Sequence, residues 1–224
     1  MKERPILFST PMVRALLAGT KTQTRRVVAL GKLTPLSEFA CCGERRFAWC
    51  DKVGEGEAAD ERNFLALCKF GESGDRLWVR ETWARDEEDG SVLYRADDNA
   101  DTQNWDQQRQ ESGLAKYNWR PSIYMPRWAR RITLEITAVR AERLHCISEA
   151  DAVAEGAAWG ACGGPQIGSH RAGYAALWEQ INGPGSWDAN PWVWVIEFER
   201  RDFADQITPV IAGQLPVALP EPRP

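Results

Sequence analysis

The chain has 224 residues, six of them Cys, and its formal net charge at pH 7 is −4. This length is sufficient for a domain with a full hydrophobic core, which excludes a small disulfide-stabilised scaffold, and the net acidity disfavours a general coat for nucleic acid. No apolar run approaches the roughly 18 to 20 residues that cross a bilayer, and no starting segment has the pattern of a signal peptide. We therefore expect a soluble, cytoplasmic protein without membrane contact.

The charges are unevenly distributed along the chain. Residues 1–30 hold six basic residues against one acid, a net of +5, and residues 120–145 hold six against two, a net of +4. Residues 86–111 lie between them and carry nine acids against two Arg, a net of −7. Two basic segments separated by an acidic one suit a localised anionic ligand better than a long nucleic-acid track.

The first thirty residues predict a strand, a helix and a second extended segment. Residues 5–8 (PILF) are apolar throughout, which is typical of a short buried strand. Ser9 is a suitable helix N-cap, the apolar residues of 12–17 share one helical face, and Gly19 is a suitable helix end. The loop GTKTQTRR (19–26) therefore leaves a helix, and β-branched residues predict that 22–28 are extended.

The middle of the chain alternates between strands and irregular segments. Residues 31–70 contain Gly, Pro and clustered Cys and are predicted to be irregular. Residues 76–83 (RLWVRETW) alternate as a strand, and 91–96 are the predicted returning strand of a hairpin. Residues 97–118 are acidic without a core pattern, so we expect an exposed insertion, and 119–129 contain two Pro in a fixed irregular loop.

The last third predicts a strand, two helices and a central strand. Residues 132–144 alternate as a strand, and a capping box at 148–151 opens a short helix that ends at Glu155-Gly156. A second helix runs from Ser169 to Asn182-Gly183, and 192–200 (WVWVIEFER) is apolar on both faces, as in a central strand. Residues 205–224 are rich in Pro and are predicted to form a flexible tail. This order predicts a mixed α+β domain with a curved sheet or partial barrel.

Several motifs in this order resemble the ASCH family of the PUA-like superfold. They are PMVRALLAGTKTQTRR, GDRLWVRETW, ITLEITAVRAERL, SEADAVAEG and WVWVIEF, and the match is nearest to the long branch associated with phages and prophages. The resemblance implies an α+β fold with a β-barrel, flanking helices and large loop insertions. It implies a single domain over 1–204, with insertions around 31–70 and 97–118 and the tail at 205–224.

The same resemblance implies an activity. One branch of the family is an amidohydrolase that removes the acetyl group from 4-acetylcytidine with a Lys, a Thr and a Glu. Carried over residue by residue, these are Lys21, Thr24 and Glu155. The family also implies partners: a modified nucleoside or nucleotide, or single-stranded RNA. It points to no cofactor and to no particular oligomeric state.

The residues themselves are compatible with this chemistry. Amide hydrolysis needs a nucleophile, a base and a proton donor for the leaving amine. Burial and the neighbouring Arg25 and Arg26 would lower the pKa of Lys21, which could then activate Thr24, while Glu155 carries the proton. The alternatives are a solvated Lys21, a Thr24 with only a strand role and an exposed Glu155. Arg25 and Arg26 are predicted to bind ligand or phosphate rather than to form structural ion pairs.

Three further residues are candidates for substrate binding. Glu81 shares a face with apolar residues, so it either pairs with an Arg or bonds to a base edge. Trp83 and Tyr124 either stack on a base or pack in the core or a lid. The Cys residues at 41, 42, 50 and 68 lack the C-x-x-C pairing of structural zinc, so we predict no metal site.

Two classes of function remain open at this point. The first is a hydrolase of an acylated or modified cytidine-like nucleoside or nucleotide, with a ribonuclease in the same cleft as a variant. The second is a PUA-like module that binds RNA or a modified base without catalysis.

Overall fold

The computed structural model describes residues 1–29, 37–41, 44–50, 56–60, 64–87, 89–98, 111, 117–161 and 168–201, with only the backbone in 37–60 and at 161. Helices and strands both occur in one mixed chain, which confirms the α+β class. The helices are α1 (Thr10–Leu17), α4 (Glu149–Ala154) and α5 (His170–Asn182), with 3-10 turns η1 (Ser122–Tyr124), η2 (Arg127–Ala129) and η3 (Leu144–Cys146). In this part of the chain, no helix is both long and apolar enough to cross a membrane.

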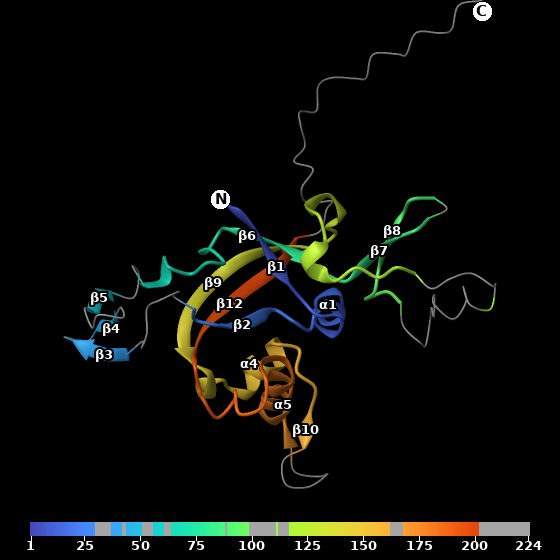
Figure 1. The fold of residues 1–224 in the computed structure, drawn as a ribbon. Coiled ribbons are helices and arrows are strands. Elements are labelled where there is room, and N and C mark those ends of the chain that lie inside the picture. Colours follow the sequence, from blue (N-terminus) through green and yellow to red (C-terminus); the bar gives the residue numbers. More distant parts are fainter. Residues whose placement is uncertain are drawn as a thin grey trace, which may run out of the picture.

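The main sheet has five strands in the order β1-β6-β9-β12-β2. They are β1 (Glu3–Leu7), β6 (Arg76–Arg80), β9 (Thr133–Arg143), β12 (Trp192–Arg201) and β2 (Gln23–Val27). β1 and β6 are parallel and the other neighbours antiparallel. The long strands β9 and β12 curve strongly (Figure 1). The two ends of the strand order approach each other, since Arg26 of β2 donates to the Leu7 carbonyl of β1 at 2.6 Å.

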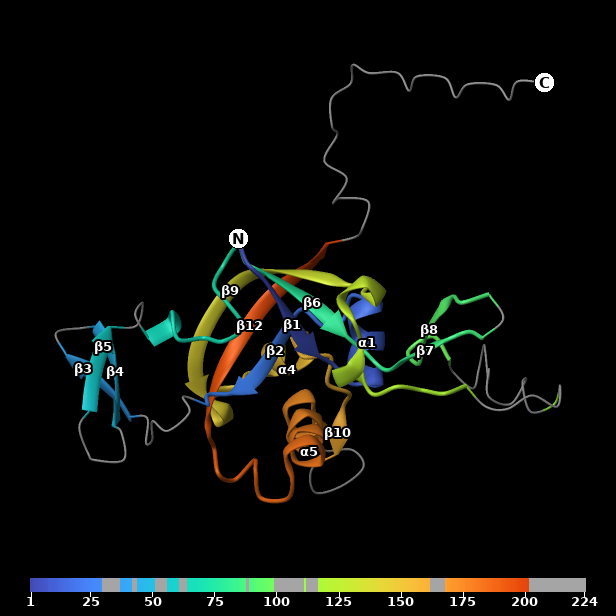
Figure 2. The ribbon, with the colours of Figure 1, turned by 45° about the horizontal axis from the view of Figure 1, so that its top comes forward.

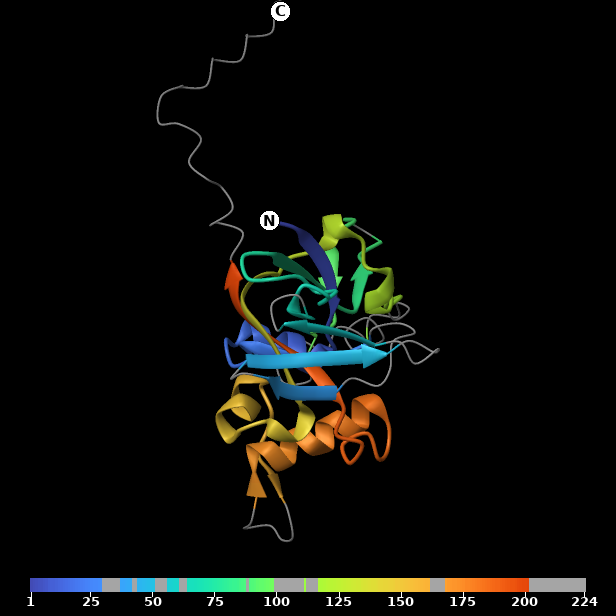
Figure 3. The same ribbon diagram turned by 90° about the vertical axis from the view of Figure 1, so that its left-hand side faces the viewer.

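Each face of β12 contributes to a different hydrophobic cluster, as its apolar sequence predicts. Trp194, Ile196 and neighbours on one face pack with α1 and β1. Val193 and Val195 on the other face pack against α4 and α5. The two helices lie together against this second face (Figure 3, yellow and orange). The predicted position of this strand inside the sheet is confirmed by its pairing with both β9 and β2.

Helix ends lie where the sequence places them. Ser9 is the N-cap of α1, and Gly19 follows its end with φ +74°. Ser148 and Asp151 form the predicted capping box of α4, whose C-cap is Glu155. Ser169 caps α5, and Gly183 ends it with φ +97°. These signals are local, so they could be predicted without knowledge of the tertiary structure.

The predicted strand 76–83 is two strands. β6 ends at Arg80, and β7 (Trp83–Arg85) leaves the main sheet to form a hairpin with β8 (Val92–Tyr94). At the break, the Glu81 amide donates to the Met125 sulfur at 3.2 Å. The hairpin itself is as predicted.

The prediction that 31–70 is irregular is wrong. This segment contains a three-stranded antiparallel sheet of β3 (Ser37–Cys41), β4 (Glu44–Cys50) and β5 (Gly56–Asp60), which lies to one side of the main sheet (Figure 2). Phe64 is fully buried and packs on Trp194 with ring centroids 4.9 Å apart. Polar residues interrupt these short strands, so no apolar alternation marks them.

Most of the predicted insertion at 97–118 and all of the tail at 205–224 lie outside the described residues. A short hairpin of β10 (Gly160–Ala161) and β11 (Gly168–Ser169) precedes α5.

Candidate functional site

The loop after α1 and the end of α4 form the base of the site. Lys21 and Glu155 are bridged through their backbones, and the Thr22 amide donates to the Ala154 carbonyl at 2.8 Å. Gly156, with φ +75°, turns the chain away directly after Glu155. A Cβ at this position would lie 3.0 Å from Ala15 of α1, so glycine permits the close approach of the two segments. Two residues 134 positions apart are thereby brought together.

Lys21 is buried and bound to Glu155. Its Nζ donates to Glu155 Oε2 at 2.7 Å and to the Glu155 carbonyl at 2.8 Å, and only 3% of the residue is exposed. Burial lowers the pKa of Lys21, an effect that the charge of Glu155 partly offsets. Lys21 is therefore not a solvated surface charge, and its neutral form is more accessible than that of a lysine in water.

Arg25 holds the second oxygen of Glu155. Its guanidinium lies 3.2 Å from Glu155 Oε1, 2.6 Å from Glu142 and 3.4 Å from Asp151, and its side chain is fully enclosed. Burial alone would raise the pKa of Asp151, but hydrogen bonds from Ser148 and the charge of Arg25 lower it to about 2. Three carboxylates thus surround one buried guanidinium. The prediction that Arg25 binds ligand rather than forming structural ion pairs is therefore wrong, because its guanidinium is occupied in orienting Glu155 and the neighbouring carboxylates.

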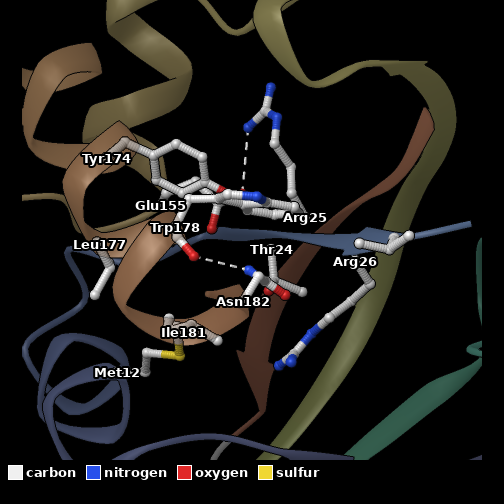
Figure 4. Close-up of a pocket in the computed structure, with 11 residues that line it drawn as sticks. Met12, Thr24, Arg25, Arg26, Glu155, Tyr174, Leu177, Trp178, Ile181 and Asn182 are labelled. Atoms are coloured by element: carbon white, nitrogen blue, oxygen red, sulfur yellow. Dashed lines mark hydrogen bonds and ion pairs between the residues drawn. The ribbon is translucent and has the colours of Figure 1, made fainter. Parts of the chain in front are cut away.

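Thr24, Arg26 and Glu155 line a common cavity. Thr24 is buried, and Figure 4 shows it on β2 between Glu155 and the Arg26 side chain. The cavity has about 60 Å³ for the centres of water-sized molecules. A single water needs roughly 10 to 15 Å³ by this measure, so there is room for a small group of atoms. The lining residues are Met12, Thr24, Arg25, Arg26, Val27, Glu155, Tyr174, Leu177, Trp178, Ile181 and Asn182.

Arg26 contributes an unused donor to this site. One terminal nitrogen donates to the Leu7 carbonyl, but Nε is buried and has no hydrogen-bond partner among the described residues. The guanidinium lies 5.2 Å from the centre of the Phe8 ring, and burial lowers the pKa of Arg26. A buried donor without a partner is costly, and a ligand oxygen could satisfy it.

The wall contributed by α5 was not predicted as part of a site. Tyr174 and Trp178 are 4% and 5% exposed, and both border the cavity (Figure 4). Burial raises the pKa of the Tyr174 phenol. In the sequence, Tyr174, Leu177, Trp178 and Ile181 follow i, i+3, i+4, i+7 spacing, which is typical of a helix face that packs in a core. The available signal was chemical, because Tyr and Trp carry a polar group that an aliphatic core residue lacks.

Glu81, Trp83 and Tyr124 do not line this cavity. Glu81 is buried in a bidentate ion pair with Arg131, with both oxygens at 2.9 Å, which is the ion-pair alternative for this residue. Burial raises the pKa of Glu81, and the bonds from Arg131 oppose this. Trp83 packs with Met125 in a separate cluster, whereas Tyr124 is 70% exposed. The residues predicted to form one site therefore lie in two separate parts of the structure, and Glu81, Trp83 and Tyr124 are away from the cavity.

Comparison of the chain with protein-family models, with curated proteins and with solved structures finds no match. Among the described residues, no three His, Cys, Asp or Glu side chains are arranged to hold a metal ion. Cys68 and Cys146 are free thiols, and the side chains of Cys41, Cys42, Cys50 and Cys162 lie outside the described residues.

Proposed function

We propose that the protein is a hydrolase of the amidohydrolase type that acts on an acylated cytidine-like nucleoside or nucleotide. Lys21, Thr24 and Glu155 are its proposed reacting groups. The observation that carries the proposal is the buried pair of Lys21 and Glu155, 2.7 Å apart, of which Glu155 lines a cavity together with Thr24. A buried group whose pKa is lowered, as that of Lys21 is, close to a cavity is typical of catalytic sites.

Movement of one proton within the Lys21–Glu155 pair provides both a base, the neutral Lys21, and an acid, the protonated Glu155. Transfer of that proton from Lys21 to Glu155 gives a neutral amine and a carboxylic acid, a change that burial of Lys21 favours. In the proposed reaction, Thr24 Oγ attacks the acyl carbon and its proton passes to Lys21. The C–N bond then breaks, and Glu155 gives its proton to the leaving amine. Lys21 then passes its proton to Glu155 again, water attacks the acyl carbon and gives a proton to Lys21, the ester bond to Thr24 Oγ breaks, and Glu155 returns a proton to Thr24 Oγ. The carboxylic acid is released and the starting state is restored.

The other lining residues suit the remaining needs of this reaction. The free Nε–H of Arg26 is a suitable donor for the oxyanion that forms at the acyl oxygen. Tyr174 and Trp178 offer aromatic surface for a planar base. Arg25 keeps Glu155 oriented toward Lys21. Each role uses a contact or an unused donor of the described residues.

A PUA-like barrel of the ASCH type is part of the same proposal. Its support is the curvature of β9 and β12 (Figure 1) and the hydrogen bond from the Arg26 side chain of β2 to the Leu7 carbonyl of β1, which links the two terminal strands of the sheet. In such a barrel the cavity would lie between the closed sheet and the flanking helices α1 and α5.

The test is release of acetate and cytidine from 4-acetylcytidine by the purified protein. Wild type is expected to turn over, whereas Lys21→Met and Thr24→Val are expected to lose activity by a factor of about 100 or more while remaining folded. Thr22→Val is the matched control, because Thr22 is an exposed neighbour on the same loop, and it should leave turnover unchanged. Absence of turnover by wild type on a panel of acylated nucleosides would refute the proposal.

A second candidate is binding of a modified base in the cavity without chemistry. One observation favours it: among the described residues, Lys21 donates only to Glu155, and no hydrogen bond links it to Thr24. Catalysis requires that the bond from Nζ to the Glu155 carbonyl be exchanged for one to Thr24. Equilibrium binding of 4-acetylcytidine that survives Thr24→Val, without product formation by wild type, would support this candidate.

A further inference from the structure

A second feature of the surface is the loop of residues 119–131, here named the aromatic loop. Ile123, Tyr124 and Trp128 are 56%, 70% and 64% exposed, although the loop is short. A single exposed apolar residue needs no explanation, but three within six positions form a patch of the kind that marks interaction sites. The amidohydrolase chemistry proposed above does not use them.

The aromatic loop is held in one conformation. Pro121 and Pro126 precede its two 3-10 turns, η1 and η2. Arg80 of β6 donates to the carbonyls of Ile123 and of Met125, the latter at 3.2 Å. Met125 is itself buried at 1% exposure. The exposed side chains are therefore presented from a fixed backbone, which reduces the entropic cost of binding a partner.

The charge of the aromatic loop is positive. It contains Arg120, Arg127, Arg130 and Arg131 and no acid. Arg131 is engaged by Glu81 and Asp97, and Glu3 pairs with both Arg127 and Arg130. Arg120 is exposed and lies over the Trp83 ring, 5.1 Å from its centre. Among the described residues, Glu3 is thus the one acid paired with Arg127 and Arg130, so these two Arg and Arg120 leave a positive balance around the exposed aromatic residues.

We propose that the aromatic loop binds single-stranded nucleic acid, with Tyr124 and Trp128 stacking on bases and Arg120 and Arg127 contacting phosphates. Aromatic faces bind bases of any sequence, and Arg supplies the phosphate contacts, so the combination suits a single strand. A duplex keeps its bases stacked on one another and offers no free base faces to these rings. Within the aromatic loop, Ile123 is the one exposed large aliphatic side chain, which is little surface for a hydrophobic protein partner.

The aromatic loop is linked to the cavity through two adjacent residues. The Phe8 amide donates to the Arg80 carbonyl at 3.1 Å, and Arg80 in turn holds the aromatic loop. Leu7, the preceding residue, accepts the hydrogen bond from Arg26 of the cavity. If the proposed hydrolase function is correct, on which this step rests, the acylated base is part of a polynucleotide whose flanking nucleotides stack on the aromatic loop.

The test is fluorescence anisotropy with labelled single-stranded RNA and DNA oligonucleotides and a matching duplex. Wild type is expected to bind single strands more tightly than the duplex, and Tyr124→Ala/Trp128→Ala should weaken this by about tenfold or more. Arg120→Ala/Arg127→Ala should reduce the dependence of affinity on salt. Trp159→Ala is the matched control, because Trp159 is 62% exposed but belongs to the segment before α5. The RNA and DNA arms identify the sugar that is preferred.

The proposal is overturned if wild type binds no single strand at low salt, or if the Tyr124 and Trp128 variant binds as tightly as wild type. Hydrolysis of free 4-acetylcytidine separates this proposal from the previous one, since the loop variant should hydrolyse the free nucleoside at the wild-type rate. Loss of oligonucleotide binding in that variant supports the aromatic loop proposal even if no hydrolysis is found. Circular dichroism of each variant checks that the exposed substitutions leave the fold intact.

Discussion

Replacement of Glu155 by Gln tests the buried charge cluster most severely. The carboxylate accepts from Lys21 at 2.7 Å and from Arg25 at 3.2 Å, and the two basic side chains are 1% and 0% exposed. Gln has the same shape but no charge, so the substitution leaves Lys21 as a buried cation without a counterion. Arg25 keeps Glu142 and Asp151, which limits the damage to one side of the cluster.

The expected loss of stability is large. Breaking a buried pair by removing one partner costs about 3 to 5 kcal/mol, because the other charge remains desolvated. Lys21→Met should cost less, about 1 to 3 kcal/mol, since Glu155 is still paired with Arg25. In the double variant the two changes should compensate, with a coupling energy of about 1 to 3 kcal/mol.

Urea unfolding followed by Trp fluorescence measures all three variants, and the 11 Trp residues provide the signal. Equal m-values would show that the changes in midpoint report stability rather than a change in compactness. A cost under about 1 kcal/mol for Glu155→Gln, together with a simply additive double variant, would refute this reasoning, because the pair would then be exposed and weakly coupled in solution.

Three further predictions concern other parts of the molecule. Gly156→Ala should destabilise the fold by about 1 to 2 kcal/mol and reduce hydrolysis, because φ is +75° and the new Cβ would lie 3.0 Å from Ala15. Gly183→Ala is the control: its φ is +97° but the new Cβ meets open space, so the loss of stability should be smaller and activity should be unchanged. The pKa of Asp151 is lowered to about 2, so the ionised carboxylate stabilises the fold above the unfolded pKa near 4, and this stabilisation is lost as the pH falls toward 2. The loss in wild type should be about 1 kcal/mol, because solvent screens this partly exposed group. The free energy of unfolding of Asp151→Asn, measured over the same pH range, should not show this loss. Glu81→Gln should lower the urea midpoint by leaving Arg131 with Asp97 alone, yet kcat/KM for the free nucleoside should stay within about twofold of wild type.

The parts of the fold that follow local rules could be predicted from the sequence. Ser148 and Ser169 specify helix starts through the hydrogen bonds of their side chains, Ser9 takes the N-cap position through its extended backbone, and glycines after the helices specify their ends through backbone angles. The strand at 192–200 is apolar on both faces, so its place inside the sheet followed from burial alone. The sheet at 37–60 could not be predicted, because its short strands carry polar residues and their pairing is a tertiary property.

The candidate site was only partly predictable for the same reason. The family resemblance predicted that Lys21 and Glu155 belong to the same site. No spacing rule could have predicted this, because the two residues are 134 positions apart. The ion pairs of Arg25 involve Glu142 from β9 and Asp151 from α4, which are brought together only in the folded chain. Glu81 shows the opposite case, because its position on an apolar face correctly indicated burial but did not reveal which arginine it binds.

The measurement that tests the central claim most directly is the time course of acetate release from 4-acetylcytidine by wild type and by Lys21→Met, at equal concentrations of folded protein. Wild type should release stoichiometric acetate and cytidine, and the variant should release none above background. Equal release by the two proteins would contradict the claim, because the buried Lys21–Glu155 pair would then have no part in the chemistry.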